Sequence, residues 1–132
     1  MITRARELSD DPLHSFLIFL KLYAEAMEEL VDLHPGCFVA TVSFQDQVFD
    51  KEVRRLNNAT ALAWRKTFIT WLEEIAAVHP PRGQLQAADL ADAILAFTYG
   101  GMTLDKALQD NGAIARQAML FRETVRLHFQ PH

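Results

Sequence analysis

The residues of this chain that could carry catalytic or metal chemistry are its histidines, its cysteine and its paired carboxylates. The five histidines are spread along the sequence, at His14, His34, His79, His128 and His132. No two of them have the His-x-x-x-His spacing within one expected helix, and none follows the Glu-x-x-His pattern, so no helix face would present two metal ligands. We therefore expect surface or turn histidines, with no metal and no cofactor.

Cys37 is the only cysteine, so the chain can form no internal disulfide, as suits a reducing cytoplasm. It follows a glycine at an expected helix start, where the helix dipole would lower the thiol pKa. A redox-sensing thiol is therefore one interpretation. A small apolar residue on a helix-packing surface is the favoured one.

The carboxylate pairs do not converge on a site. Glu28-Glu29 and Glu73-Glu74 are adjacent on expected helices, where neighbouring side chains point about 100° apart. The sequence also lacks a Gly-x-Ser-x-Gly motif and a glycine-rich phosphate loop, because Gly100-Gly101 lies inside a helical pattern. We therefore expect the chain not to be an enzyme.

The composition is that of one globular domain. Of the 132 residues, 50% are hydrophobic and 23% are charged, and the formal net charge is −4. A DNA-binding surface is usually basic, so this chain alone is a poor candidate for holding DNA. The longest apolar run, residues 16–20, is far short of the ~20 residues that a membrane span needs. The first residues are unlike a signal peptide, and we expect a cytoplasmic location.

Apolar residues recur at spacings of three and four, which predicts an all-α fold of about five main helices. We expect helices over Pro12–Leu33, Cys37–Phe49, Lys51–Val78, Ala87–Asp110 and Ala113–Phe129, after a short helical segment at Ile2–Leu8. Asp11 and Asp50 are expected to cap the helices that follow them. Cys37–Phe49 has a strand-like composition, but the chain offers no partner strand, so a short buried helix is predicted there.

Large apolar side chains and a few polar ones share the faces expected to point inward. Such a mixture is typical of a pocket for a small, mostly apolar ligand. The same side chains could instead fill a core, which is the commoner outcome for an aromatic stripe. The candidate ligand-binding residues are Phe16, Leu20, Tyr23, Met27, Phe38, Thr41, Gln45, Trp64, Phe68 and Trp71.

The last two expected helices each carry an apolar stripe, and a glycine on the first stripe would let another helix come close. These stripes can pack inside the domain or against a second copy. The candidate dimer-interface residues are Leu90, Ile94, Phe97, Gly101 and Leu104 on one helix, and Ala118, Phe121 and Val125 on the other.

Four stretches together resemble the C-terminal half of TetR-family transcriptional regulators. They are Asp11-Pro12-Leu13, Gly36-Cys37-Phe38-Val39, Glu52-Val53-Arg54-Arg55-Leu56 leading into a helix with Trp64, and the helix from Asp89 to Gly101. The resemblance covers about residues 11–129. Its most distinctive part is the Gly-Cys step followed by apolar residues.

The resemblance implies an effector-binding domain that forms a homodimer through a four-helix bundle of its last two helices. The effector would lie among the helices between Pro12 and Val78, with help from the last two helices. Residues 1–10 would be the tail of a linker helix, and DNA would be read only by a helix-turn-helix domain that this sequence lacks. We therefore expect either an isolated sensor domain or a truncated reading frame, in which Gly101→Leu weakens the dimer more than the fold.

Two other functions remain open at this point. One is a helical interaction module with a filled core and no ligand. The other is a small helical enzyme or cofactor carrier, which would need convergent polar or metal-binding groups that the histidine spacing does not supply.

Overall fold

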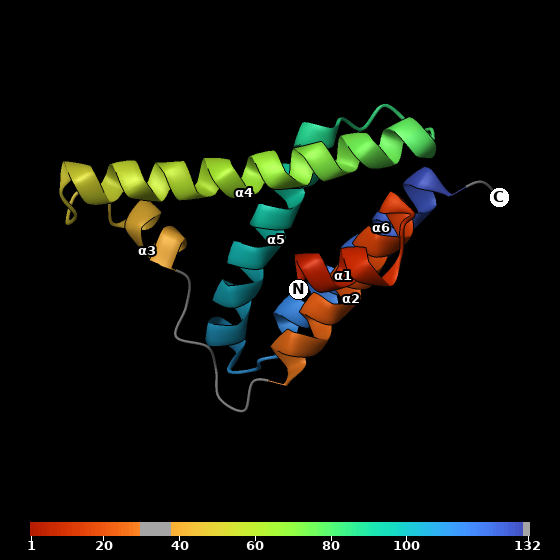
Figure 1. The fold of residues 1–132 in the computed structure, drawn as a ribbon. Coiled ribbons are helices and arrows are strands. Elements are labelled where there is room, and N and C mark those ends of the chain that lie inside the picture. Colours follow the sequence, from red (N-terminus) through yellow and green to blue (C-terminus); the bar gives the residue numbers. More distant parts are fainter. Residues whose placement is uncertain (30–37, 131–132) are drawn as a thin grey trace.

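The computed structural model describes residues 1–29 and 38–130, and this part of the chain forms six helices and no strand (Figure 1). The all-α prediction is therefore confirmed. The short N-terminal segment is helix α1, and the others are the expected five. Their bounds are α1 Ile2–Leu8, α2 Pro12–Glu28, α3 Phe38–Phe44, α4 Lys51–Val78, α5 Ala87–Leu108 and α6 Ala113–Phe129.

Two of the helices begin at the predicted aspartate caps. The Oδ1 atom of Asp11 accepts a hydrogen bond of 2.8 Å from the backbone N–H of His14, and Pro12 occupies the first turn of α2. Asp50 accepts a bond of 2.9 Å from the backbone N–H of Val53 at the start of α4. Each cap satisfies an N–H group that the first helical turn leaves without an intrahelical partner.

The expected and observed bounds differ at three ends. Helix α2 ends at Glu28 with Glu29 as its C-cap, and residues 30–33 of the expected segment lie outside the described residues together with Cys37. Helix α3 is shorter than predicted, and α5 ends at Leu108 because Gln109 adopts a left-handed conformation with φ of 53°.

The prediction that the segment around α3 is buried is wrong. Val42 is buried, but Phe44 is 86% exposed and Val48, in the turn after the helix, is 78% exposed. The physical reason is that α3 packs mainly against α4, so only one of its faces is covered.

The core lies where α2, α4, α5 and α6 meet. Trp71 of α4 is fully buried, and its ring meets the ring of Phe16 edge-on with centroids 5.0 Å apart. The indole N–H of Trp71 donates a hydrogen bond of 3.1 Å to the carbonyl oxygen of Pro12. This indole therefore ties α4 to the start of α2 through both an apolar and a polar contact.

Helices α5 and α6 pack closely inside the chain. Gly101 is buried, and a Cβ atom at this position would lie 2.8 Å from the Cα atom of Ile114. The rings of Phe97 and Phe121 continue the contact, with centroids 5.4 Å apart. The carboxylate of Asp105 accepts hydrogen bonds from the backbone N–H groups of Ala113 (2.8 Å) and Ile114 (3.4 Å), so it caps α6 from the preceding helix.

Helix α4 is the longest element, with 28 residues, and it lies across the top of the molecule in Figure 1. Its C-terminal part covers α1 and α2, whereas its N-terminal part extends beyond α5 with α3 beneath it. Leu56 and Leu62 on this extension are each more than half exposed. Within the described residues, no helix has both the length and the apolar composition that a membrane crossing requires.

Candidate functional site

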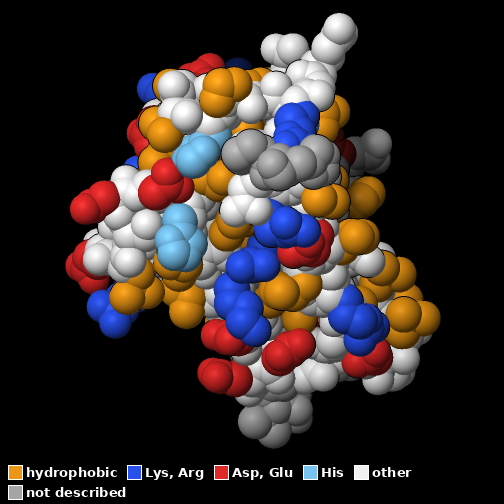
Figure 2. Space-filling view, turned by 90° about the vertical axis from the view of Figure 1, so that its right-hand side faces the viewer, with side chains coloured by type: hydrophobic (Ala, Val, Ile, Leu, Met, Phe, Trp, Pro, Cys, Tyr) orange, Lys and Arg blue, Asp and Glu red, His pale blue; other side chains and the backbone are white. Residues whose placement is uncertain are grey.

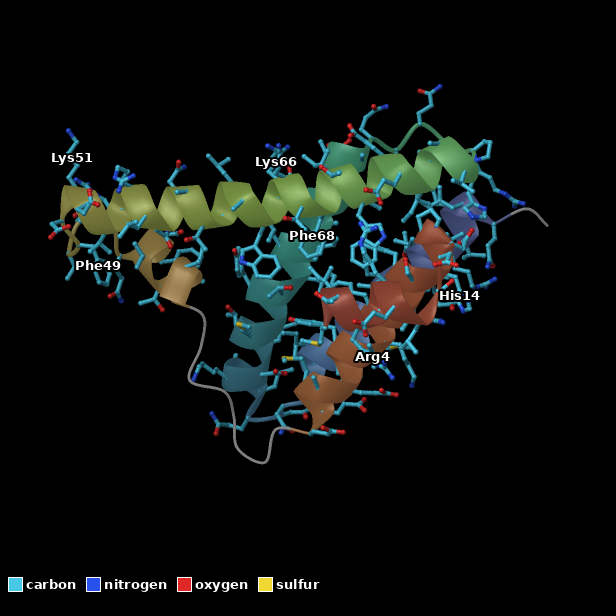
Figure 3. The ribbon with its side chains drawn as sticks, viewed as in Figure 1. Arg4, His14, Phe49, Lys51, Lys66 and Phe68 are labelled. Carbon is cyan, nitrogen blue, oxygen red and sulfur yellow. The ribbon has the colours of Figure 1, made fainter. Side chains whose placement is uncertain are left out.

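A pocket of about 460 Å³ lies between α2, α4 and α5, and residues of α1 and α3 complete its wall. Its volume falls within the range of roughly 300–1,000 Å³ that is usual for small-molecule sites. Figure 3 shows Phe68 on the side of α4 that faces α2 and α5, while Lys66 points to the outer side of the helix. The pocket therefore lies beneath the middle of α4.

Aromatic rings form much of the wall. Trp64 and Phe68 are four residues apart on α4, so they share a face, and their rings stack with centroids 5.9 Å apart and an interplanar angle of 22°. Phe68 in turn lies 5.8 Å from the ring of Phe19 on α2. Phe68 is buried, whereas Trp64 is 47% exposed. The stacked pair thus runs from the solvent into the interior.

The polar part of the wall is a set of hydroxyl groups. The Tyr23 hydroxyl of α2 donates a hydrogen bond of 3.4 Å to Oγ1 of Thr98 on α5. Tyr23 also meets Phe97 edge-on, with ring centroids 6.2 Å apart. The remaining hydroxyl-bearing residues of the wall are Thr3 and Tyr99. A ligand here would meet mostly carbon, with a few groups able to donate or accept a hydrogen bond.

The sequence located part of this pocket. Four predicted residues line it, namely Leu20, Tyr23, Trp64 and Phe68. Phe16 and Trp71 lie in the core and do not line the pocket, while Met27 packs on a cluster formed with α6. Thr41 and Gln45 are exposed and lie outside the pocket wall. The side chain of Phe38 lies outside the described part of the structure.

Several lining residues were missed by the sequence prediction. Ile94 and Phe97 carried the right signal, an inward-facing helical stripe, but they were assigned to a dimer interface. Leu95 and Thr98 lie beside that stripe on α5. Met1, Ile2 and Thr3 at the start of α1 and Val39 of α3 line the pocket without any local signal, because their position depends on how these helices pack.

The predicted interface stripes face the inside of this chain. Leu90, Ile94, Gly101, Ala118, Phe121 and Val125 are buried against neighbouring helices of the same chain. Phe97 packs between Tyr23 and Phe121, and only Leu104 is clearly exposed, at 41%. The expectation that Gly101 faces a second copy is therefore corrected, because Ile114 of the same chain occupies that side. Helical periodicity identifies an apolar face but not what covers it.

The described histidines, His14, His79 and His128, do not line this pocket. Nε2 of His79 is 2.6 Å from Oδ2 of Asp11, which links the end of α4 to the start of α2. Burial opposes ionisation of Asp11, but hydrogen bonds from the backbone N–H of His14 and from His79 outweigh it and lower the pKa of this carboxyl. Figure 2 shows histidines of the described chain among acidic and basic side chains on the face at the right of Figure 1.

A second hollow lies beside this pair, lined by Asp11, Leu13, His14, Leu17, His79 and Gln130. Its volume of about 430 Å³ is similar to that of the pocket under α4, but it is more open to solvent. No group of three histidine, cysteine or acidic side chains placed to hold a metal occurs among the described residues.

Comparisons of the chain with protein-family models, curated proteins and solved structures found no match. The function must therefore be inferred from the pocket and from the helices around it.

Proposed function

We propose that this chain is the effector-sensing domain of a TetR-like transcriptional regulator, and that it binds a small, mostly apolar molecule in the pocket under α4. The observation that carries the proposal is the 460 Å³ pocket between α2, α4 and α5. The resemblance implies an effector among the helices between Pro12 and Val78, which include α2 and α4, with help from the last two helices, which include α5. The wall has the composition of a ligand site, with many apolar side chains and few polar ones.

The position of α1 supports a sensing role. In the TetR-family regulators that this chain resembles, the corresponding helix leads toward the DNA-reading domain. Met1, Ile2 and Thr3 line the pocket, so a bound molecule would touch α1 directly. Arg6 holds the same helix against α4, with its guanidinium 4.3 Å from the Trp71 ring centroid and 2.9 Å from the carboxylate of Glu74. A ligand that binds more tightly when α1 is in one position would raise the fraction of molecules with α1 in that position.

A fluorescent probe tests ligand binding. N-phenyl-1-naphthylamine is uncharged and fluoresces strongly in apolar surroundings, so we expect its emission to rise on titration into the protein. Thr98→Trp should abolish this rise because the indole would fill the pocket. Thr70→Trp is the matched control, since Thr70 is an exposed residue of α4 outside the pocket wall. Equal binding by the two variants would show that the probe binds elsewhere and would refute the proposal.

We also propose that two copies associate through the outer faces of α5 and α6. The inner faces are already used within the chain, whereas each helix exposes leucines on its outer side. These are Leu104 and Leu108 on α5 and Leu120 and Leu127 on α6. A dimer through these helices would place two DNA-reading heads at a fixed separation, as operator half-sites require.

The alternative is an interaction module that binds no small ligand. The exposed apolar residues on and after α3 and along α4 favour it, because such surfaces often mark protein contacts. The probe titration separates the two functions, since a module without a ligand would not give a signal that depends on Thr98.

A further inference from the structure

The pocket under α4 has an unusual balance of polar groups. Apart from the indole N–H of Trp64, its polar side-chain groups are the hydroxyls of Thr3, Tyr23, Thr98 and Tyr99. Among the described lining residues, none has a charged side chain. A hydroxyl donates one hydrogen bond and accepts others, so it suits an uncharged oxygen group as well as another hydroxyl.

Two ion pairs join α4 to the helices around the pocket, and in each the opposite charges bind one another. Arg65 of α4 makes two hydrogen bonds to the carboxylate of Asp92 on α5, at 2.6 and 3.2 Å. Neither residue lines the pocket. Arg6 is similarly bound to Glu74. These charges therefore neither compensate nor attract a charged ligand inside the pocket.

Resting on the proposed function, we infer that the pocket selects an uncharged, flat ligand that carries one oxygen-containing group, such as an alcohol, phenol or ketone. A charged group loses its hydration on entering an apolar site and needs a partner charge, which the described side chains of this wall do not supply. An uncharged oxygen group needs only a hydroxyl partner. The stacked rings of Trp64 and Phe68 offer a planar face against which a ring system can lie.

The Tyr23–Thr98 pair is where the oxygen group would bind. Their hydroxyls come from two different helices and are 3.4 Å apart, which is long for a hydrogen bond between oxygens. A ligand oxygen that joins this pair would bridge α2 and α5. Specificity for the oxygen group therefore depends on both side chains.

Four naphthalene compounds of similar size test the inference. They are naphthalene, 2-naphthol, 2-naphthoate and 2-(aminomethyl)naphthalene, measured at pH 7 by isothermal titration calorimetry. We expect 2-naphthol to bind at least tenfold more tightly than the anion and the cation. Both charged forms are measured so that weaker binding can be assigned to charge itself and not to the sign of the charge.

Two conservative variants test the position of the oxygen group. Tyr23→Phe and Thr98→Val should each weaken 2-naphthol binding about three- to tenfold, the loss expected for one hydrogen bond. Naphthalene binding should stay unchanged. Thr67→Val is the matched control, since Thr67 is exposed and its hydroxyl bonds to the carbonyl oxygen of Ala63.

The outcomes are distinct. Charged probes that bind as tightly as 2-naphthol would overturn the inference and leave the proposed ligand-sensing function standing. Unchanged 2-naphthol affinity in both hydroxyl variants would overturn the assignment of the oxygen group to this pair. No binding of any of these compounds, or of N-phenyl-1-naphthylamine, would overturn the proposed function itself.

Discussion

At the scale of single residues, the two adjacent glycines of α5 have opposite surroundings. A Cβ atom on Gly100 would meet nothing within 4 Å, whereas one on Gly101 would lie 2.8 Å from the backbone of Ile114. We expect Gly100→Ala to raise the free energy of unfolding by up to about 1 kcal/mol, because alanine is the better helix former. We expect Gly101→Ala to lower it by about 1–3 kcal/mol, because α6 would have to move. Urea unfolding of both variants measures the difference.

Each glycine variant serves as the control for the other, since the chemical change is the same one residue apart. Equal effects would show that α5 and α6 do not pack through Gly101. Gly101→Leu is likewise expected to damage the fold of the single chain, in contrast to the sequence-based expectation that it acts mainly on a dimer.

His128 is a buried histidine whose titration makes the folding stability depend on pH. Desolvation lowers its pKa below the ordinary value of 6.5, and its Nε2 atom has no hydrogen-bond partner among the described residues. Between the lowered pKa and 6.5, the unfolded chain binds more protons at this residue than the folded chain does. The contribution of His128 to folding stability is therefore present above pH 6.5 and decreases as the pH falls through this interval.

His128→Leu should flatten the dependence of unfolding free energy on pH below about pH 6.5, since leucine cannot titrate. Chemical unfolding at half-unit pH steps measures it, with the exposed His14→Gln as the control. An unchanged slope in His128→Leu would show that His128 is protonated equally in the folded and unfolded states.

At the scale of elements, α6 depends on a cap supplied by α5. Asp105 is fully buried, and its Oδ1 atom accepts hydrogen bonds from the N–H groups of Ala113 and Ile114. Asp105→Ala should lower the free energy of unfolding by about 1–3 kcal/mol, because two buried N–H groups would lose their acceptor. Thermal and urea unfolding measure this loss.

Asp110→Ala is the matched control for the cap. The carboxylate of Asp110 also accepts a hydrogen bond of 2.9 Å, from the backbone N–H of Gly112 just before α6. Asp110 is exposed, so water can take its place as the acceptor. An effect of Asp105→Ala no larger than that of Asp110→Ala would contradict the capping role.

The sequence predicted helix starts well where the cap is local. Asp11 and Asp50 stand directly before their helices, and both caps were predicted. The start of α6 at Ala113 was predicted, but its cap, Asp105, lies eight residues before Ala113 and gives no local signal. The exposure of α3 was missed because an apolar sequence shows what should be buried, not whether a partner element is present.

At the scale of the whole molecule, the sequence predicted the walls of the pocket from α2 and α4 but not the wall from α5. The faces of α2 and α4 were found because their aromatic residues follow the helical period. The wall from α5 was assigned to another use, since Ile94 and Phe97 carry the same periodicity whether they face a ligand, a core or a second copy. Only the packing of α5 against α2, α4 and α6 distinguishes these uses.

The outer faces of α5 and α6 determine whether two copies associate. Leu120 of α6 is 61% exposed, and burying such a side chain in a dimer would be favourable by about 1.5–3 kcal/mol. We expect the chain to sediment as a dimer at tens of micromolar and Leu120→Glu to sediment as a monomer, because the interface would have to bury an unpaired charge.

Leu62→Glu makes the same change on the extended part of α4, where Leu62 is 54% exposed. We expect this variant to remain dimeric, because α4 lies outside the proposed interface. A monomeric wild-type chain would refute the dimer altogether. A dimer that survives Leu120→Glu but dissociates in Leu62→Glu would move the interface from α6 to α4, and the exposed side chains along α4 would then be its contact surface.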